Sequence, residues 1–394
     1  MFNSFYKNKR VFLTGHTGFK GSWLAEWLLL LGAEVHAYAL APQSHQILFS
    51  QLDLESRLAS NMFGDITDQA KLTAKIQEVQ PDLILHLAAQ PLVRLSFEIP
   101  VETMNTNIMG TAHLLEAARQ LDKKCTVICI TTDKCYENRE WLYSYREEDA
   151  MGGYDPYSAS KSAAELVISS FRRSYFSKCG PIRLASARAG NVIGGGDWSW
   201  DRIVPDCVRA LRKGEPIPVR NKTATRPWQH VLEPLSGYLW LAASLATAEN
   251  DSPEFSKQGI QSSGARNEII APRTKFQSNI PVAALASGFN FGPNLNSNRT
   301  VAELVHELIE HTGGEWQDHS DPNALHEASK LNLAIDKAFH LLQWQPVWNF
   351  KTTIAATAKW YLSEAHGNPP QELTVQQIKD YHQDAIAHEL PWAF

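Results

Sequence analysis

Short apolar runs alternate with amphipathic segments through the first part of the chain. The runs at residues 11–14, 34–39, 61–63, 82–86 and 126–130 predict strands, and the segments at 23–31, 69–79 and one ending near Arg119 predict the helices between them. Strands that alternate with helices are typical of a parallel sheet covered by helices on both faces. We therefore predict an α/β protein with a Rossmann-type doubly wound parallel sheet, which binds its ligands at the carboxyl ends of the strands.

The pattern is less regular after about residue 190. It predicts a strand at 289–291, helices at 301–311 and near 351–364, and then a polar tail whose apolar ending, LPWAF, is expected to dock on the body. Residues 249–287 are polar, rich in Ser, Asn and Pro, and lack a clear period, so we interpret them as a solvated loop insertion away from the chemistry. We predict two domains, 1–190 and a smaller α/β domain at 191–394.

Composition and charge narrow the class of partner. The chain has 394 residues, of which 44% are hydrophobic, and its formal net charge of −5 gives no basic face for a nucleic acid. The N-terminus has no apolar core of a signal peptide, and the longest apolar stretch, 23–31, is too short to span a bilayer. We expect a cytoplasmic protein whose partner is a small molecule rather than a nucleic acid or a membrane.

Cysteine and histidine spacing gives no sign of a metal site or a disulfide. The five cysteines include no Cys-x-x-Cys pair, and none of the fourteen histidines stands at a convincing ligand spacing. Cys125 and Cys129 lie four apart on a predicted strand, so they are roughly 13 Å apart at about 3.3 Å per residue and read as core thiols. We predict no metal.

A glycine-rich turn follows the first strand. In TGHTGFKGSW, Gly15, Gly18 and Gly21 stand three apart between the strand and the helix, where missing side chains let backbone N–H groups approach a pyrophosphate. Glycines in such a turn can also be merely conformational. The alternating strands and helices downstream favour a nucleotide-binding turn.

Ionisable side chains gather at two further places. Asp133 and Lys134 directly follow the apolar run 126–130, and the carboxyl end of a parallel strand points into the ligand crevice. Tyr157 and Lys161 stand four apart in YDPYSASKSAAELV, at the start of a predicted helix, and so share one face. A lysine ammonium favours a neighbouring phenolate, so we expect Lys161 to lower the pKa of Tyr157 toward that of a general base.

With these motifs the chain resembles the extended short-chain dehydrogenase/reductase family of nucleotide-sugar enzymes. The resemblance runs from residue 9 to about 365 and is carried by TGHTGFKG, LILHLAAQPLVR, TNIMGTAHLLEA, TTDKCYEN, YSASK, RAGNVIGGGDW and RPWQHVLEPLSGYLWLA. Within the family it is greatest to the branch of 4,6-dehydratases that act on CDP-glucose. Asp133 and Lys134 distinguish this branch from the others, because the dTDP-glucose branch has Asp-Glu there and the epimerases lack the pair.

The resemblance implies a hydro-lyase of deoxysugar synthesis that retains NAD through its cycle. The residues it assigns to the cofactor are Gly15, Thr17, Gly18, Phe19 and Gly21 at the pyrophosphate, Asp65 and Ile66 beside the adenine, Ala88 and Ala89 along the cofactor, and Tyr157 and Lys161 at the nicotinamide end. The second strand ends in AYALAPQ, which has neither the acid nor the arginine that would distinguish NAD from NADP. The choice of NAD therefore follows from the family alone.

For the chemistry, the resemblance implies that Tyr157 takes the proton of the sugar C4 hydroxyl, to which Thr132 is hydrogen-bonded. Asp133 is the expected acid for the C6 oxygen, which requires burial to raise its pKa. Lys134 is either the base at C5 as a neutral amine, a charged stabiliser of the enolate, or a structural partner of Asp133. The residues expected at the substrate, CDP-glucose, are Gln90, Asn191, Arg202, Arg220, Arg226 and Asn290, since guanidinium groups bind a diphosphate well.

Other functions remain open at this stage. A 4,6-dehydratase or 4-epimerase acting on another nucleotide sugar fits the same motifs, and a non-catalytic NAD-binding regulator fits the same fold. The family resemblance also implies a homodimer or a higher homo-oligomer.

Overall fold

The fold is built on a seven-stranded parallel sheet. The computed structural model describes residues 1–176, 180–249, 280–320 and 330–394, and in it the strand order is β11-β6-β5-β4-β1-β2-β3, with every neighbouring pair parallel. The strands are β1 (Arg10–Thr14), β2 (Glu34–Ala39), β3 (Ser60–Phe63), β4 (Leu83–His86), β5 (Cys125–Ile130), β6 (Ile182–Ala189) and β11 (Gly288–Phe291). The order reverses between β1 and β4, which is where such sheets open a ligand crevice. The predicted fold class is confirmed.

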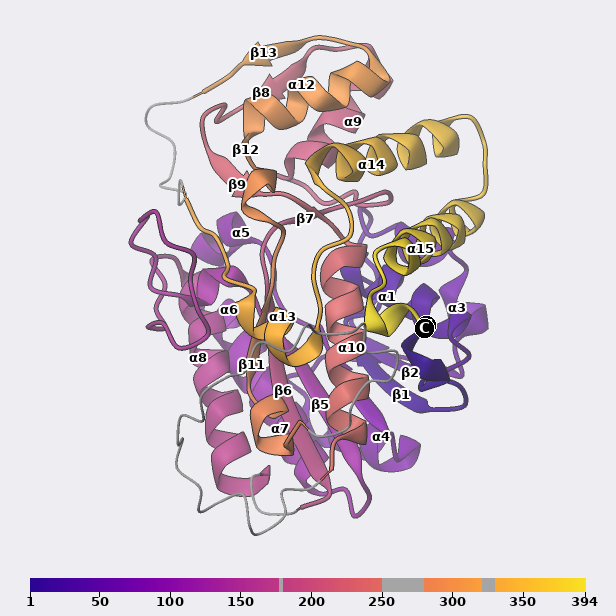
Figure 1. The fold of residues 1–394 in the computed structure, drawn as a ribbon, viewed down its shortest axis with the longest axis vertical. Coiled ribbons are helices and arrows are strands. Elements are labelled where there is room, and N and C mark those ends of the chain that lie inside the picture. Colours follow the sequence, from indigo (N-terminus) through magenta and orange to yellow (C-terminus); the bar gives the residue numbers. More distant parts are fainter. Residues whose placement is uncertain (177–179, 250–279, 321–329) are drawn as a thin grey trace, which may run out of the picture.

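Helices cover both faces of this sheet (Figure 1). On β5 successive side chains alternate between two cores: Val127 belongs to the core that contains residues of α4 (Gln69–Val79) and α7 (Gly110–Arg119), and Ile128 to the core that contains residues of α1 (Phe19–Leu30) and α10 (Leu232–Thr247). Cys125 and Cys129 are buried and free, as the sequence predicted. The whole of β5 is therefore buried on both sides up to its carboxyl end.

The predicted helix that ends near Arg119 is divided. It consists of α6 (Pro100–Met104), a π-helical turn (Asn105–Met109) and α7. The turn places Asn107 so that its Nδ2 atom donates to Ser160 Oγ at 2.8 Å, while its Oδ1 atom accepts from Gln90 N at 2.8 Å. Asn107 thus ties the loop after β4 to the helix α8 (Pro156–Phe171).

Part of the chain after residue 190 forms the upper region of Figure 1, while α10 and β11 lie lower, at the level of the sheet. The short strands are β7 (Val192–Ile193), β8 (Ile217–Val219), β9 (Thr225–Pro227), β10 (Gln229–His230), β12 (Asn298–Thr300) and β13 (Trp316–Asp318), and they pair as β10 with β7, β12 with β9 and β13 with β8. The remaining α-helices are α2 (Leu48–Gln51), α3 (Leu54–Arg57), α5 (Val93–Glu98), α9 (Ile203–Lys213), α11 (Val282–Leu285), α12 (Val301–Thr312), α13 (Asp336–Leu342), α14 (Phe350–Ala365) and α15 (Pro370–Ala387). Because β11 also comes from this half and forms an edge strand of the sheet, and α10 packs against the sheet, both predicted domains contribute to this layer of the fold.

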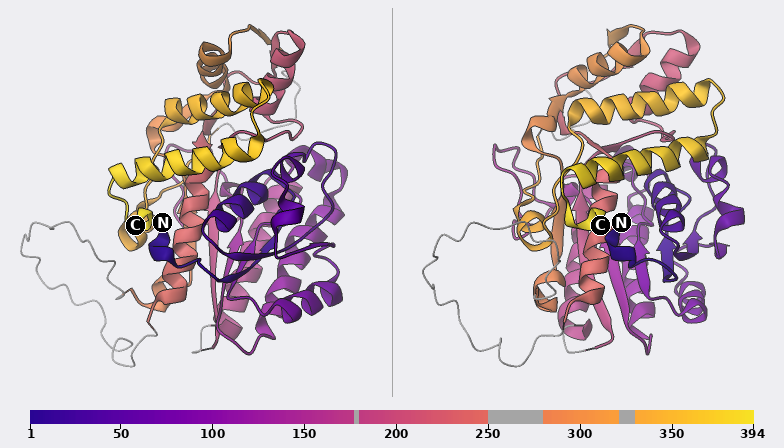
Figure 2. Two further views of the ribbon diagram at one scale, coloured as in Figure 1. Left: turned by 90° about the vertical axis from the view of Figure 1, so that its right-hand side faces the viewer. Right: turned by 45° about the vertical axis from the view of Figure 1, so that its right-hand side comes forward.

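The C-terminal segment differs from the predicted polar tail. Residues 370–387 form the helix α15, whose buried Ile378, Tyr381 and Ala385 recur at helical spacing. The docking of the LPWAF ending is confirmed: the Trp392 ring stacks on Phe2 at 5.4 Å between centroids, and Phe394 O accepts from Asn3 N. The two chain ends consequently lie side by side (Figure 2).

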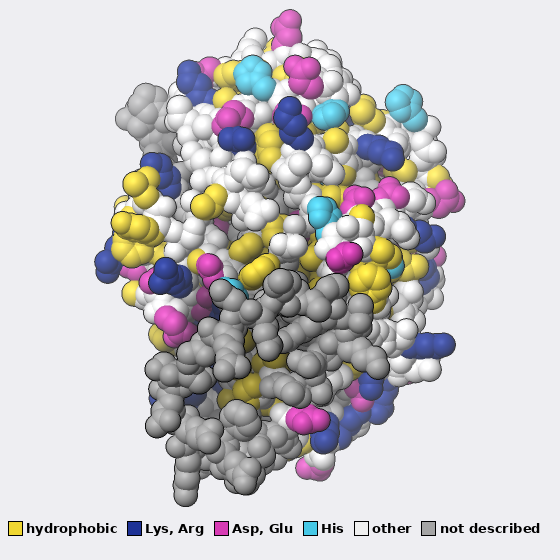
Figure 3. Space-filling view, viewed as in Figure 1, with side chains coloured by type: hydrophobic (Ala, Val, Ile, Leu, Met, Phe, Trp, Pro, Cys, Tyr) yellow, Lys and Arg dark blue, Asp and Glu magenta, His cyan; other side chains and the backbone are white. Residues whose placement is uncertain are grey.

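Most of the predicted insertion, residues 250–279 of 249–287, lies outside the described residues. The described residues at its C-terminal end contain the short helix α11, whereas the sequence pattern predicted no helix there. In the described part of the chain, no helix combines the length and the apolar content needed to cross a bilayer. Lys and Arg side chains are interspersed with Asp and Glu over the face shown in Figure 3.

Candidate active site

The glycine turn leaves one position open toward a ligand. A Cβ atom at Gly15, where φ is 78°, would lie 2.7 Å from Ala88 N, and one at Gly21 would lie 2.1 Å from Gly15 O, so the packing of the chain itself requires both glycines. At Gly18 the nearest atom, Gly15 O, would be 3.5 Å away. Gly18 is also the N-cap of α1 and offers no side chain to the free N–H groups of the helix. This turn therefore fits an anionic group such as a diphosphate.

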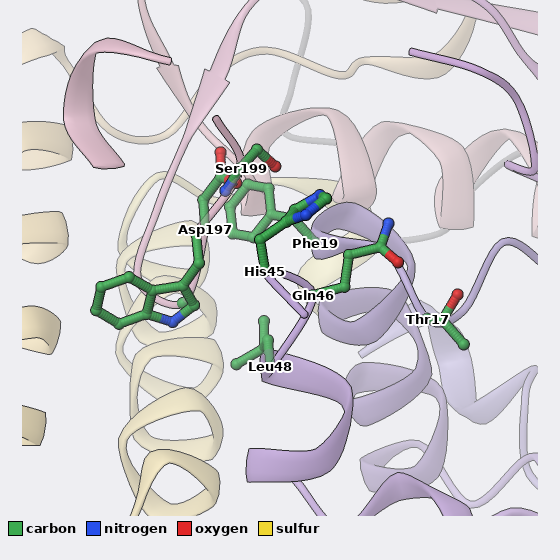
Figure 4. A pocket seen from close by; sticks show the side chains of 9 residues that line it. Thr17, Phe19, His45, Gln46, Leu48, Asp197 and Ser199 are labelled. Atoms are coloured by element: carbon green, nitrogen blue, oxygen red, sulfur yellow. The ribbon is translucent and has the colours of Figure 1, made fainter. Parts of the chain in front are cut away.

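A small pocket adjoins the turn (Figure 4). It is lined by two residues expected at the cofactor and by segments from both halves of the chain, namely Thr17, Phe19, His45, Gln46, Leu48, Gly196, Asp197, Trp198 and Ser199. Thr17 Oγ1 donates to Leu40 O at 3.1 Å, which fixes the segment after β2 above the turn. The segment Gly196 to Ser199 thus lies against the glycine turn, although it is far away in sequence.

The other residues expected at the cofactor lie at neighbouring strand ends. Ala88 follows β4 and its N–H donates to Thr14 Oγ1 at 3.2 Å, and Ala89 comes next. Asp65 is exposed, and its Oδ1 atom accepts from Thr67 N at 2.8 Å. Ile66 is only 4% exposed and belongs to the core. Only a small part of the Ile66 side chain is therefore accessible to an adenine.

The end of β5 places an acid in a buried position. Thr132 Oγ1 donates to Asp133 Oδ1 at 3.0 Å and accepts from Lys134 N at 3.3 Å, which caps the 3-10 turn Asp133–Cys135. Asp133 is 4% exposed, and burial raises its pKa although the Lys134 charge lowers it. The raised pKa expected for a general acid is confirmed. A Cβ atom at Gly190 would lie 2.7 Å from Asp133 Oδ2, so a glycine is needed where β6 ends.

Tyr157 and Lys161 lie on the first turns of α8 and are 8% and 7% exposed. Asp155 caps this helix, since its Oδ1 atom accepts from Ser158 N at 2.9 Å, and Pro156 fixes the first turn. The Tyr157 N–H donates to Ser96 Oγ at 3.2 Å, which joins the helix start to α5.

The pKa of Tyr157 differs from the sequence-based expectation. Burial raises it, and the Thr132 hydroxyl and the Arg202 charge lower it by less. Burial likewise lowers the pKa of Lys161 to about 8. The expectation that Lys161 makes the Tyr157 pKa low is thus wrong, because desolvation outweighs the nearby charges.

Lys134 is half-buried beside the acid. Among the described residues no ion pair joins Lys134 to Asp133, although its charge lowers the pKa of Asp133. The role of Lys134 stays a prediction, with the chemical and the structural alternatives open.

The sequence analysis missed Lys20, the lysine within the glycine turn. Its Nζ atom donates to Tyr238 OH at 3.3 Å. The pKa of Lys20 is lowered to about 7, mainly by burial and also by the charges of Arg202 and Lys161, although Asp133 raises it. The position of Lys20 between Gly18 and Gly21 of the glycine turn was the sequence signal that could have identified it.

Two of the arginines expected at the substrate act on the crevice. Arg202 forms an ion pair with Asp197 at 3.0 Å and lowers the pKa of Tyr157, and Arg226 lowers the pKa of Asp133. Arg220 is 40% exposed and pairs instead with Asp201 and Asp206. Arg202 and Arg226 are therefore the better candidates for a diphosphate.

Two of the three residues with side-chain amides have their polar atoms bonded within the chain. Asn290 is fully buried: its Oδ1 atom accepts from Tyr136 OH at 2.7 Å, and its Nδ2 atom donates to Tyr145 O and Ala334 O. The side chain of Gln90 is bonded to Leu92 and Thr103 in the same way. These internal bonds argue against substrate contacts by Asn290 and Gln90. Asn191 lies between β6 and β7, near Gly190.

The parallel sheet, the open phosphate turn and the Tyr157–Lys161 helix define an extended short-chain dehydrogenase/reductase. The model of the family described as GDP-mannose 4,6 dehydratase matches residues 12–251. The chain belongs to this family of nucleotide-sugar 4,6-dehydratases, which are NAD-dependent hydro-lyases.

Relatives and solved structures agree with this assignment. The chain is 42% identical to a CDP-glucose 4,6-dehydratase from Salmonella typhimurium, over 96% of this chain and 97% of the relative. It is 25% identical to a dTDP-glucose 4,6-dehydratase of the same organism, over 90% and 93%. The structure of a dTDP-glucose 4,6-dehydratase from Streptomyces venezuelae with NAD and TYD bound has a TM-score of 0.69 at 22% identity, over 92% of this chain and 99% of that one.

Proposed function

We propose that the chain is a CDP-glucose 4,6-dehydratase, which converts CDP-D-glucose to CDP-4-dehydro-6-deoxy-D-glucose and water with NAD. The observation that carries the chemistry is that Thr132, Asp133, Tyr157 and Lys161 meet at the carboxyl end of β5. The choice of CDP-glucose is supported by the 42% identical relative of that name. The choice of NAD is supported by the neighbouring structures that contain it.

The residues present fit a dinucleotide. Gly18 and the N-terminus of α1 would hold its diphosphate, and Lys161 would hold the nicotinamide ribose. When bound, NAD would supply the redox chemistry, as acceptor of the C4 hydride and donor of the same hydride to C6.

Tyr157 removes the C4 hydroxyl proton as a general base, and Thr132 holds the same oxygen. Because burial raises the pKa of Tyr157, the phenolate must be stabilised by the positive charges around it. Arg202 already lowers this pKa, and the Lys161 ammonium and a bound nicotinamide would add to its effect. The base is thus active only when the site is complete.

The ketone at C4 makes the C5 proton acidic, and the C6 hydroxyl then leaves as water. Asp133 is protonated more readily than an ordinary aspartate, so it can donate a proton to the departing oxygen. Lys134 lies directly beside it and either takes the C5 proton or stabilises the enolate. The C5 position regains a proton when the hydride returns to C6, and the sum of the steps is the loss of one water.

The burial of Asp133 also separates an enzyme from a non-catalytic NAD-binding regulator. Burying a carboxyl group and raising its pKa costs stability, and perturbed groups of this kind gather at catalytic sites. A sensor of NAD needs neither Asp133 nor Tyr157. We also infer a cytoplasmic enzyme that forms a homodimer or higher oligomer, on family resemblance alone.

The test is to incubate the purified chain with CDP-, dTDP-, UDP- and GDP-hexoses and to detect a 4-keto product by mass spectrometry and NMR. We expect CDP-glucose to lose water and the other nucleotides to react much more slowly. An Asp133→Asn variant serves as the matched control, since it keeps the side-chain shape but cannot act as the acid. Turnover of another nucleotide sugar in preference to CDP-glucose, or a 4-epimer without loss of water, would contradict the proposal.

A further inference from the structure

An ion pair joins two segments that leave the sheet on either side of the catalytic strand. In the sheet β5 lies between β4 and β6, so the chain after β4 and the chain after β6 flank the strand end that carries Asp133. Arg94 belongs to α5, which follows β4, and Asp201 belongs to the segment after β6. Arg94 Nη1 donates to Asp201 Oδ1 at 3.4 Å. The two flanking segments are thus in contact at the crevice.

The α5 side of this contact is fixed to the catalytic helix. Ser96 stands two residues after Arg94 and is fully buried. Its Oγ atom accepts from the backbone N–H of Tyr157 at 3.2 Å. The helix α5 therefore carries, two residues apart, a contact to the proposed base and a contact to Asp201.

The segment after β6 is anchored at its start and exposed at its tip. Gly195 O accepts from Trp23 Nε1 at 2.9 Å, and Asp197 O accepts from Tyr361 OH at 2.6 Å, with both donor side chains buried. The Asp201 side chain is 45% exposed, and its φ of 61° lies in the left-handed region that recurs in ligand clamps and switch segments. The tip is therefore the part that can move without breaking these buried bonds.

A second arginine holds Asp201 from its own half of the chain. Arg220 Nη1 donates to the same oxygen, Asp201 Oδ1, at 2.5 Å, and Arg220 Nη2 donates to Asp206 Oδ2 at 2.6 Å. These bonds do not involve α5, so they can persist when the Arg94 contact opens. Among ion pairs between described residues, Arg94–Asp201 is the one that joins the chain before residue 190 to the chain after it.

The exposure of this contact makes it weak. Both side chains are 45% exposed, and an exposed ion pair changes an equilibrium by about two- to fivefold at most and is screened by salt. A nucleotide sugar has to enter and leave the crevice in every turnover, whereas a reaction intermediate has to stay. A weak closing contact meets both requirements.

We propose that Arg94 and Asp201 are positioning residues of the substrate site, whose ion pair closes the crevice over the bound nucleotide sugar and slows its release. This inference rests on the proposed function, in which the C4 ketone stays bound until C6 has been reduced. Neither side chain takes part in a bond-making step. When the contact is lost, some of the ketone leaves before water is eliminated, and the hydride taken from C4 stays behind on the nicotinamide.

The experiment is the release rate of CDP from the chain with NAD bound, measured by stopped flow. CDP is the probe because it has no sugar to react. We expect it to leave Arg94→Met and Asp201→Asn about two- to fivefold faster than the native chain at low salt. In about 1 M salt, where the Debye length is about 3 Å, the ratio of variant to native rates should fall to about one.

Turnover provides a second readout. With CDP-glucose as substrate, both variants should release a fraction of CDP-4-dehydroglucose that has not lost water, together with an equal amount of NADH. The native chain should release neither. The rate of C4 oxidation within the bound complex should stay within a few-fold of native, because the substitutions leave the end of β5 unchanged.

Three further variants separate the pair from a general effect of charge. Arg94→Lys keeps a cation on α5 and should release CDP at close to the native rate. Arg119→Met removes a cation of similar exposure, 43%, whose pair with Glu116 lies within α7, at the amino edge of the sheet, so its release rate should be native. The double variant Arg94→Met with Asp201→Asn should be no faster than the faster single variant, because both remove the same contact.

The outcomes are distinct. Native release by Arg94→Met, effects that multiply in the double variant, or equal acceleration by Arg119→Met would overturn the inference. Release is also measured for dTDP, UDP and GDP. A chain that prefers one of these, or that binds CDP but dehydrates no nucleotide sugar, would refute the proposed function, while the release rate of the bound nucleotide still decides the role of the pair. Binding of none of the four would refute both.

Discussion

A single methyl group at Gly190 should separate the two stages of the reaction. The Cβ atom of Gly190→Ala would lie 2.7 Å from Asp133 Oδ2, 3.4 Å from Asp133 Cγ and 3.5 Å from Pro227 Cγ. The carboxylate is buried and bonded to Thr132, so it cannot simply turn into solvent. The substitution therefore displaces the acid without changing its chemistry.

The magnitude follows from the contact. An ordinary contact begins at 3.4 Å, so Asp133 must give way by the difference, 0.7 Å. A misplacement of about 1 Å costs on the order of 10²-fold in rate, and overpacking of a close-packed site costs about 1–3 kcal/mol of stability. We expect elimination to slow by roughly ten- to a hundredfold and the chain to stay folded.

The assay follows the two stages separately under single-turnover conditions. The absorbance of the reduced nicotinamide reports C4 oxidation, and mass spectrometry reports the loss of water. In Gly190→Ala the reduced cofactor should form within a few-fold of the native rate and then accumulate, because elimination is slowed. Gly214→Ala is the control: it introduces a side chain at a φ of 68° with nothing within 4 Å, so it lowers stability without touching the site. Native elimination by Gly190→Ala, or equal loss of both stages, would refute the reasoning.

Three further substitutions test single side chains. Tyr157→Phe should lose about 10²- to 10⁴-fold in turnover while still binding NAD, and near-native turnover would remove Tyr157 from its role as the base. Lys134→Met should keep C4 oxidation but stop solvent deuterium from entering at C5, whereas exchange at the native rate would exclude Lys134 as the base. Gly18→Ala should fold normally, because its Cβ atom meets only Gly15 O at 3.5 Å, but it should bind NAD weakly. Gly21→Ala should unfold more easily, because its Cβ atom would lie 2.1 Å from Gly15 O. Equal stability of these two glycine variants in thermal unfolding would contradict the description of the turn.

The sequence predicted most of the sheet because its strands are short, apolar and bounded by polar residues or glycine. The bounds of β2 and α4 agree with the prediction to the residue, and β5 is buried along its whole length. The helix α15 was missed because its buried face is small and its remaining residues are polar, so its low hydrophobicity resembled a tail. The addition of β11 to the sheet and the packing of α10 against it depend on contacts between distant segments, which local periodicity does not contain.

The side chains of the site were predicted less evenly. Spacing and strand ends were enough to select Asp133, Tyr157 and Lys161, because these signals are local. Whether an amide faces a ligand or the interior depends on the surrounding donors and acceptors, so the sequence did not show the internal hydrogen bonds of Asn290 and Gln90.

Residues that support the site without reacting were not predicted. The fit of Gly190 against Asp133 and the pairing of Arg94 with Asp201 both join segments that are far apart in the sequence. Their role becomes visible only when the segments after β4, β5 and β6 are packed together.

The central claim is that one chain oxidises C4, removes water across C5 and C6, and reduces C6 with the same hydride. The most direct test is to convert CDP-glucose that carries deuterium at C4 and to locate the label in the product by NMR and mass spectrometry. We predict that the deuterium appears at C6 of the same molecule, with no net formation of NADH. Release of the label into solvent, its retention at C4, or NADH in proportion to product would contradict the claim.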